Sequence, residues 1–308
     1  MLTRRRISYS SLLSTLAIID SLSRYNVGVS KHTIKHYNPR DILALNNIST
    51  AFLATIYYPT LHKSSQEPKP YLEPELAAIL EAQLNYTAGF LSFSDLLSAT
   101  WRALVSHGYT VVGLDHAFEQ PFIRFPNVDT VALLNYFPEL VQELRAPFST
   151  THIGSFGYSL GGVAAVGSIY ADDRLVSGLN LDGQLIGQRE VRNDTAADTG
   201  KPVLFLGNGL HTGQDVAHDI TWGTFPQQQT AYFGKFLVNG TMHHDFSDDT
   251  FWKTIQPTDP TTGPIDECRQ VDIVNTYVGA FLDFALLGRH SAILDGPSTE
   301  WPEVTYYG

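Results

Sequence analysis

Residues 150–170 read TTHIGSFGYSLGGVAAVGSIY, and this stretch decides the fold of the chain. Residues 150–156 have the pattern of a short buried strand, and residues 163–170 have that of a helix. Between them, Gly157 and Gly161 flank Ser159 in a G-x-S-x-G turn. Because side chains two positions before and after the serine would collide in so sharp a turn, we expect glycine to be required at both positions. The turn then holds the Ser159 hydroxyl clear of the backbone.

A strand, this turn and a helix in succession form the nucleophile elbow of the α/β-hydrolases. The rest of the chain alternates strands and helices without a break in composition. This alternation predicts a mostly parallel central sheet with helices on both faces, in a single α/β-hydrolase domain over residues 25–308. Further strands are predicted over residues 27–34, 48–58, 110–115, 175–181, 202–206 and 235–238. Further helices are predicted over residues 74–84, 94–106, 129–144 and 273–285.

Composition excludes several classes of function. Hydrophobic residues make up 43% of the 308-residue chain and charged residues 17%, which favours a sizeable folded core. The net charge of −11 argues against a nucleic-acid partner and against attraction to anionic membranes. Any contact with a lipid surface should therefore be apolar. Cys268 is the only cysteine, so an intrachain disulfide is excluded and cysteine chemistry is not expected.

The N-terminal residues 1–24 are predicted to be a leader or a signal peptide. Arg4 to Arg6 precede a short apolar run at residues 12–19, as the basic and apolar regions of a signal peptide do. The pattern favours secretion, with a cytoplasmic location as the alternative. Four N-x-S/T sequons lean the same way, and they lie at Asn47, Asn85, Asn193 and Asn239.

A serine nucleophile needs a histidine base, and in α/β-hydrolases the chain order is serine, acid, histidine. His243 follows the last predicted strand closely, which places it at the carboxyl edge of the sheet. His244 is its neighbour and the alternative. His211 and His218 follow the preceding strand, and we expect both to be surface-loop residues.

The acid has two candidates. Asp182 directly follows the strand over residues 175–181, whereas Asp215 lies deeper in the loop after the next strand. A carboxylate at a strand end is held more rigidly, so Asp182 is favoured. Its alternative role is that of a turn residue before Gly183.

The segments around all three positions resemble the platelet-activating-factor acetylhydrolase family, in the plasma and intracellular type II branch with its fungal and bacterial relatives. The resemblance extends over roughly residues 25–290. It implies a calcium-independent serine esterase that removes short acyl groups from phospholipids or similar esters, with Ser159, Asp182 and His243 as its triad. Neither a metal nor a cofactor is expected. The matching segments are residues 104–116, 157–162 (GYSLGG), 179–183 (LNLDG) and 240–251 (GTMHHDFSDDTF).

The oxyanion hole is the part of the site for which the sequence leaves two readings. The Leu160 amide, at the helix N-terminus, supplies one donor. Either the Phe90 amide, in a degenerate loop at residues 88–91, is the second donor, or this donor is missing together with a strand and a loop.

The predicted function is hydrolysis of the short sn-2 acyl group of such phospholipids. A general short-chain or polyester carboxylesterase and a catalytically impaired relative are the alternatives.

Overall fold

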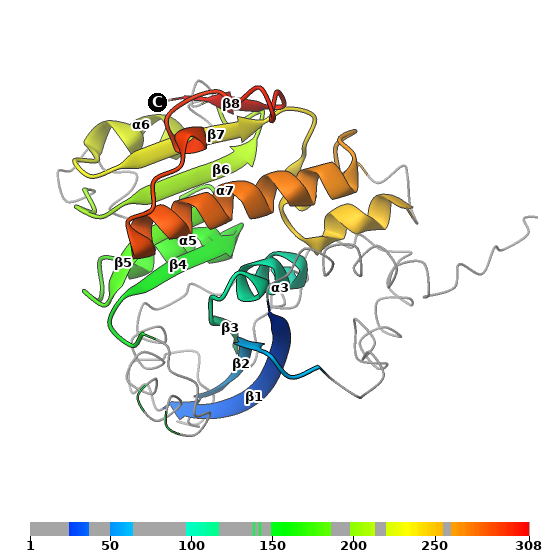
Figure 1. Cartoon of the computed structure of the whole chain (residues 1–308). Coiled ribbons are helices and arrows are strands. Elements are labelled where there is room, and N and C mark those ends of the chain that lie inside the picture. Colours follow the sequence, from blue (N-terminus) through cyan, green and yellow to red (C-terminus); the bar gives the residue numbers. More distant parts are fainter. Residues whose placement is uncertain are drawn as a thin grey trace, which may run out of the picture. The chain divides into compact units, whose positions relative to one another are not determined.

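A computed structural model of the chain describes residues 25–36, 50–63, 97–116, 149–185, 198–212, 220–254 and 260–307, together with Pro138 and Gln142 (Figure 1). The chain divides into two compact units, one of residues 1–34 and 51–122, the other of residues 35–50 and 123–308. The predicted leader at residues 1–24 and the predicted helix at 74–84 lie outside the described residues. So does all but Pro138 and Gln142 of the helix predicted at 129–144. The single-domain organisation stays a prediction.

The first unit contains a three-stranded sheet in the order β1-β2-β3. Strands β2 and β3 are antiparallel, with Ile56 opposite Val112. Helix α3 is Ser98–Ser106, and its Trp101 ring packs edge-on against Tyr57 at 5.2 Å between ring centroids. The strands are β1 (Asn26–His36), β2 (Thr50–Thr60) and β3 (Val111–His116). The three strands and the helix predicted here are therefore confirmed, with the helix starting later than expected.

The second unit is built on a five-stranded sheet in the order β4-β5-β6-β7-β8. The first four strands are parallel, and β8 pairs with β7 in the antiparallel sense. The strands are β4 (Ile153–Tyr158), β5 (Leu175–Leu181), β6 (Val203–Asn208), β7 (Phe233–Val238) and β8 (Val304–Tyr306). The sequence predicted the four parallel strands but not β8.

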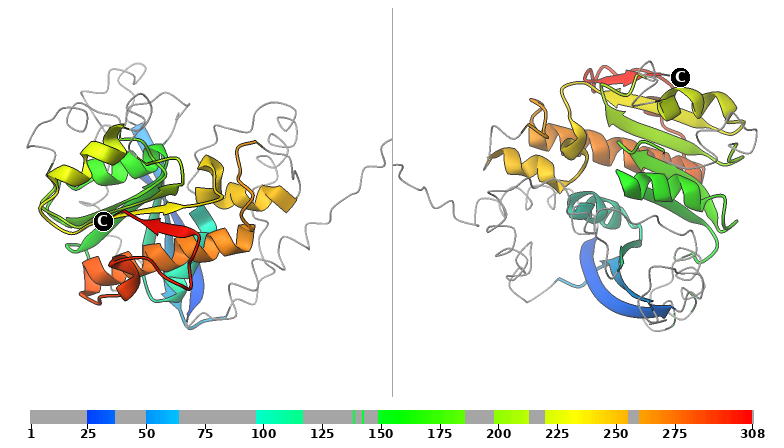
Figure 2. Two further views of the ribbon diagram at one scale, coloured as in Figure 1. Left: turned by 90° about the horizontal axis from the view of Figure 1, so that it is seen from above. Right: turned by 180° about the vertical axis from the view of Figure 1, so that it is seen from behind.

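Helices cover both faces of this sheet, as predicted. Helices α5 and α6 lie on one face and α7 on the other, which the views of Figure 2 show together. Their bounds are α5 (Leu160–Ser168), α6 (Ile220–Thr224) and α7 (Glu267–Leu287). Short 3₁₀ helices complete the unit: η4 (Pro226–Gln228), η5 (His243–Phe246), η6 (Asp248–Thr254) and η7 (Ala292–Leu294).

Helix α7 shows how local sequence sets an element's ends. Asp266 caps its first turn, because its carboxylate accepts a hydrogen bond from the Arg269 amide at 2.9 Å. Gly288 ends it in the left-handed conformation at φ 65°. Between these ends, apolar residues at helical spacing, among them Tyr277 and Phe281, are fully buried.

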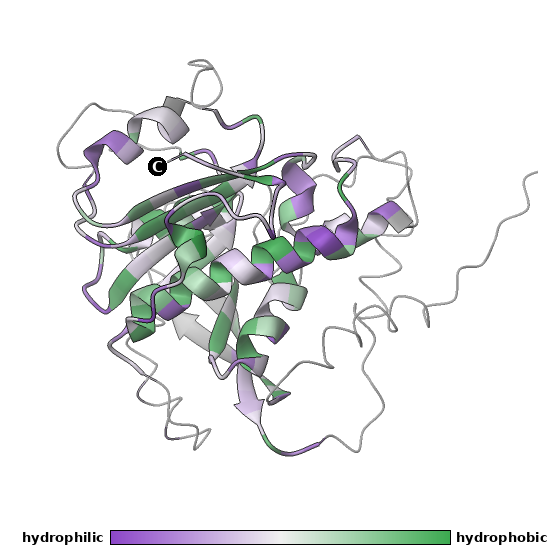
Figure 3. Cartoon of the chain, turned by 45° about the horizontal axis from the view of Figure 1, so that its top comes forward, coloured by the Kyte–Doolittle hydropathy of each residue, from purple (hydrophilic) through white to green (hydrophobic). Residues whose placement is uncertain are grey.

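The core of the second unit lies against the central strands. Every residue of β6 is buried, as expected for a parallel strand covered on both faces. On the α6 side the Phe205 ring packs against Trp222 and Phe225 at 4.9 and 5.2 Å. On the α7 side Phe236 packs against Tyr277 at 4.9 Å. In Figure 3 hydrophobic residues colour much of this sheet, whereas α7 alternates hydrophobic and hydrophilic stretches.

Candidate active site

Ser159 lies in the turn between β4 and α5 with a backbone that non-glycine residues rarely adopt. Its φ is 55° and its ψ is −123°. The Ser159 amide donates to the Leu181 carbonyl at 2.8 Å, and the Ser159 carbonyl accepts from the Gly162 amide at 3.0 Å. These hydrogen bonds hold the strained turn against the neighbouring strand β5. The sequence-predicted elbow is therefore present, with its helix starting at Leu160 rather than at residue 163.

The close approach in the elbow is made by Gly157 and Gly162. A Cβ on Gly157 would lie closer than 3.0 Å to the carbonyl group of Gly161. A Cβ on Gly162 would lie equally close to the Asn180 amide oxygen and 2.8 Å from the Gly157 carbonyl oxygen. A Cβ on Gly161, in contrast, would meet nothing within 4 Å. The expectation of a required glycine at 161 is wrong, because its backbone makes the close contact while its missing side chain faces open space.

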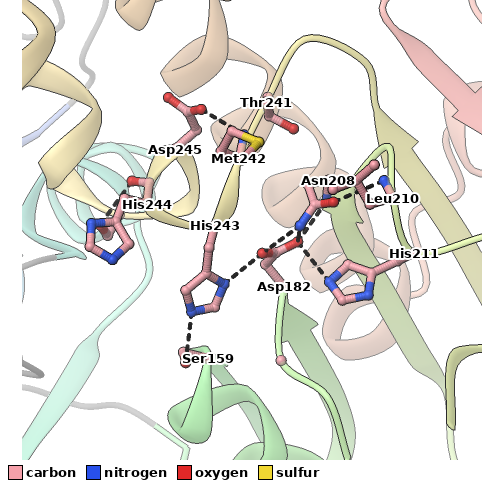
Figure 4. Close-up of polar contacts among 12 residues, drawn as sticks. Ser159, Asp182, Asn208, Leu210, His211, Thr241, Met242, His243, His244 and Asp245 are labelled. Carbon is pink, nitrogen blue, oxygen red and sulfur yellow. Dashed lines mark hydrogen bonds and ion pairs between the residues drawn. The ribbon is translucent and has the colours of Figure 1, made fainter. Parts of the chain in front are cut away.

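The structure brings Ser159, Asp182 and His243 together in one hydrogen-bonded chain (Figure 4). The His243 Nε2 lies 3.0 Å from the Ser159 Oγ. The His243 Nδ1 lies 2.6 Å from the Asp182 Oδ2. These residues follow β4, β5 and β7, whose carboxyl ends share one edge of the parallel sheet.

The Asp182 carboxylate is fully buried and saturated with donors. Its Oδ1 accepts from the Asn208 amide nitrogen at 2.6 Å, from Asn208 Nδ2 at 2.9 Å and lies 3.2 Å from His211 Nε2. Its Oδ2 faces His243. Burial alone would raise the pKa of Asp182, but the hydrogen bonds from His211 and His243 outweigh it, and this pKa lies below its ordinary value.

An ionised Asp182 determines the protons on both imidazoles. A carboxylate accepts hydrogen bonds and donates none, so the facing nitrogens, Nδ1 of His243 and Nε2 of His211, must each carry a proton. A neutral His243 then presents the lone pair of its Nε2 to the Ser159 hydroxyl. This arrangement can remove the proton from that hydroxyl.

Sequence reasoning missed Asn208 and misplaced His211. Asn208 ends β6 at the same sheet edge as the other site residues, which is the signal that could have identified it. His211 is not a surface-loop residue: its side chain is 15% exposed, and its ring stacks on Trp222 at 4.2 Å with planes 9° apart. The other two candidates of this loop, Asp215 and His218, lie outside the described residues.

The Asp245 carboxylate organises the segment that carries His243. Asp245 is fully buried, and its Oδ2 accepts from the amides of Met242 at 2.8 Å and Gly263 at 2.6 Å. Its Oδ1 accepts from the Thr250 hydroxyl at 3.0 Å and forms an ion pair with Lys253. A buried carboxylate that accepts hydrogen bonds on both oxygens holds in place the 3₁₀ turn that begins at His243.

The neighbours of His243 have distinct positions. The Tyr158 ring packs against the His243 imidazole at 4.9 Å between centroids. Burial, reinforced by Asp182 and other carboxylates, raises the pKa of Tyr158 well above its ordinary value, so the phenol stays neutral. The His244 imidazole instead lies 3.7 Å from an Asp249 carboxylate oxygen. Of the two candidate histidines, His243 is therefore the one that contacts Ser159 and Asp182.

A cavity of about 270 Å³ opens beside Ser159. Leu160 and Val163 are its apolar lining residues, and Leu160 is 41% exposed. The polar lining residues are Ser159, Asp182, Gln184, Asn208, His211 and His243. A substrate in this cavity would meet the serine together with several hydrogen-bonding side chains.

Of the two predicted oxyanion donors, Leu160 is among the described residues and Phe90 is not. Leu160 is the first residue of α5, and the first four amides of a helix have no intrahelical acceptor. Phe90 and the whole of residues 88–91 lie outside the described residues.

Within the described ranges, no group of three or more His, Cys, Asp and Glu side chains could hold a metal ion. None of the helices described is long and apolar enough to cross a membrane.

Comparisons with known proteins agree with the fold and with the family resemblance. No protein-family model matches the chain. The chain is 26% identical over 242 residues to a probable 1-alkyl-2-acetylglycerophosphocholine esterase of Arthroderma benhamiae, over 68% of this chain and 62% of the relative. It is 25% identical over 144 residues to a platelet-activating factor acetylhydrolase of Cavia porcellus, over 46% of this chain and 32% of the relative. The chain thus spans less than two thirds of the length of the curated relatives it matches.

Among solved structures, a ferulic acid esterase from Streptomyces cinnamoneus superposes with a TM-score of 0.74 at 22% identity. The match covers 93% of this chain and 98% of that one. At this identity the likeness concerns the fold, which is that of an α/β-hydrolase. The resemblance to platelet-activating-factor acetylhydrolases, predicted from the sequence segments, is confirmed by the two curated relatives.

Proposed function

We propose that this relative of the platelet-activating-factor acetylhydrolases is a serine esterase that hydrolyses short-chain acyl esters. The observation that carries the proposal is the hydrogen-bonded chain from Ser159 Oγ through His243 to the Asp182 carboxylate. A hydroxyl, an imidazole and a buried carboxylate in this order are the groups that acyl transfer to water requires.

Acylation begins when Ser159 Oγ attacks the ester carbonyl carbon while its proton passes to His243 Nε2. The carbonyl oxygen becomes an oxyanion, and the Leu160 amide at the start of α5 is positioned to donate to it. The imidazolium is stabilised by Asp182, which stays ionised. His243 Nε2 then returns the proton to the leaving alcohol as the carbon–oxygen bond breaks, and the acyl group remains on Ser159.

Deacylation repeats these steps with water as the nucleophile. His243 Nε2 takes a proton from the water as its oxygen attacks the acyl carbon. The proton is then delivered to Ser159 Oγ as that bond breaks, which releases the carboxylic acid and restores the resting site. His243 Nε2 must present its lone pair at the start of each half-reaction.

The substrate favoured is a phospholipid of the platelet-activating-factor type with an acetyl or other short acyl group at sn-2. The support is the activity for which the two curated relatives are named, a probable 1-alkyl-2-acetylglycerophosphocholine esterase and a platelet-activating factor acetylhydrolase. A general short-chain or polyester carboxylesterase is the second candidate. Three polar side chains in the lining of the cavity favour it, because a lipid chain would gain little from Gln184, Asn208 and His211.

The test compares the wild type with Ser159→Ala on p-nitrophenyl acetate and on a 2-thioacetyl phospholipid. We expect Ser159→Ala to lower kcat by at least about 10⁴-fold on both esters, because it removes the nucleophile. A fluorophosphonate should transfer its phosphonyl group to Ser159 of the wild type only, with loss of fluoride. Cleavage of the nitrophenyl ester alone would favour the general esterase. A folded wild type that is no faster than Ser159→Ala on either ester would refute the proposal.

A further inference from the structure

We propose that His211 is a positioning residue for the catalytic acid, whose Nε2–H holds the Asp182 carboxylate with its Oδ2 directed at His243. This inference rests on the proposed function of the same site. Asp182 thereby serves two imidazoles at once, one on each carboxylate oxygen, at 2.6 Å to His243 Nδ1 and 3.2 Å to His211 Nε2.

The geometry around the carboxylate places a second imidazole among its hydrogen-bond donors. The Asp182 side chain has no exposure to solvent, so protein groups must satisfy all of its acceptor positions. An ionised carboxylate offers about four such positions. Among the described residues, Oδ1 faces the Asn208 backbone amide, the Asn208 side-chain amide and His211. Oδ2 faces His243 and, at 3.0 Å, the same Asn208 side-chain amide. Removal of His211 would leave Oδ1 with the two donors of Asn208.

His211 is itself held in place by a second layer of contacts. Its ring stacks on Trp222, and the Trp222 Nε1 donates to the Gly183 carbonyl at 2.9 Å. Gly183 directly follows Asp182 in the chain. The Trp222 indole therefore links the two groups, because it stacks on His211 and donates to the residue that follows Asp182. Such a layer keeps a hydrogen-bonding group within the narrow tolerances that catalysis requires.

The chemistry assigns His211 a donor role rather than proton transfer. Because Asp182 is ionised, the His211 nitrogen that faces it carries the proton, and this nitrogen is Nε2. The neutral ring must then be the Nε2–H tautomer. A donor on Oδ1 restrains rotation of the carboxylate, which leaves Oδ2 aligned with His243 Nδ1.

Two substitutions separate hydrogen bonding from packing. His211→Phe keeps a ring to stack on Trp222 and removes the donor, whereas His211→Gln keeps a donor and removes the ring. Leu210→Ala is the matched control, since the Leu210 side chain is 71% exposed and adjoins His211 in sequence. His211→Leu serves if the Phe variant fails to fold, which thermal unfolding will reveal.

We expect His211→Phe to lower kcat on p-nitrophenyl acetate by about 10- to 100-fold, the loss that follows removal of one hydrogen bond to a charged group. KM should change by less than about threefold, because the loss concerns the acid and not substrate contacts. His211→Gln should recover most of kcat, and Leu210→Ala should match the wild type. The proposal would be overturned if the kcat of His211→Phe equalled that of the wild type or were no lower than that of His211→Gln.

A second readout does not depend on activity. Nuclear magnetic resonance of protein labelled with ¹⁵N-histidine should show His211 as the Nε2–H tautomer, and the Nδ1 proton resonance of His243 should shift in His211→Phe but little in His211→Gln. If the wild type and Ser159→Ala are equally inactive, the proposed function fails, and these resonances alone decide the role of His211. An Nδ1–H tautomer of His211, or an unmoved His243 resonance, refutes that role.

Discussion

Replacement of Gly162 by alanine tests the packing of the elbow directly. The new Cβ would lie closer than 3.0 Å to the Asn180 amide oxygen and 2.8 Å from the Gly157 carbonyl oxygen. Asn180 cannot move aside freely, because it is fully buried and its amide bonds the Gly183 carbonyl at 2.6 Å and the Gly183 amide at 2.9 Å. Gly161→Ala is the matched control, since its Cβ would meet nothing within 4 Å.

The expected magnitude follows from these contacts. Overpacking of a tight site costs about 1–3 kcal/mol, and loss of the two Asn180 hydrogen bonds costs about 1 kcal/mol each. A Gly-to-Ala change in a helix returns up to about 1 kcal/mol in both variants. We therefore expect Gly162→Ala to lower the free energy of unfolding by about 2–4 kcal/mol. Gly161→Ala should leave that free energy unchanged or raise it by up to about 1 kcal/mol.

The assay is urea unfolding followed by circular dichroism, with the midpoint and slope compared among wild type and the two variants. A lower midpoint for Gly162→Ala with an unchanged slope reports lost stability of the folded state. Equal midpoints for the two variants, or a lower one for Gly161→Ala, would refute the reasoning. A midpoint of Gly162→Ala equal to that of the wild type would mean that the elbow can relax around a methyl group at residue 162.

Two further predictions concern carboxylates outside the triad. Asp245→Ala should lower the free energy of unfolding by about 3–5 kcal/mol in urea titrations, because it deprives Lys253 and the amides of Met242 and Gly263 of a buried acceptor. A loss as small as that of Asp173→Ala, whose side chain is fully exposed, would contradict this. The hydrogen bond from the Arg174 guanidinium lowers the pKa of Asp172 from 3.8 to about 2. The contribution of this pair to the free energy of unfolding is therefore complete above pH 3.8 and is lost as the pH falls toward 2. A carboxyl titration by nuclear magnetic resonance should therefore give a pKa near 2 for Asp172 and a value raised toward 3.8 in Arg174→Ala, and an unshifted value in the wild type would exclude the pair.

Much of the second unit could be predicted from the sequence because its determinants are local. A continuous apolar run is typical of a buried parallel strand, as at residues 203–206, and residues 175–181 are mainly apolar. The elbow needs small residues around a serine, and residues 157–162 supply them. His243 and Asp182 could be placed because parallel strands bring their carboxyl ends to one edge, so a residue just beyond a strand lies near that edge.

Other features depended on contacts between distant segments. Strand β8 has only three residues, and it forms because β7 offers it an edge. The sequence motif singles out Gly161, but the Asn180 amide on the neighbouring strand leaves no room for a Cβ on Gly162 instead.

The sequence by itself determined the order of strands and helices, the elbow and the residues available for a triad, because hydrophobic period, turn chemistry and strand ends are properties of neighbouring residues. Only the tertiary structure decided that the Asp182 carboxylate contacts both His243 and His211 and accepts hydrogen bonds from Asn208. These partners lie 26 to 61 residues after Asp182 in the chain. Which side chain turns inward from a loop depends on the partners that packing places opposite it, and for His211 these are the indole of Trp222 and a buried negative charge.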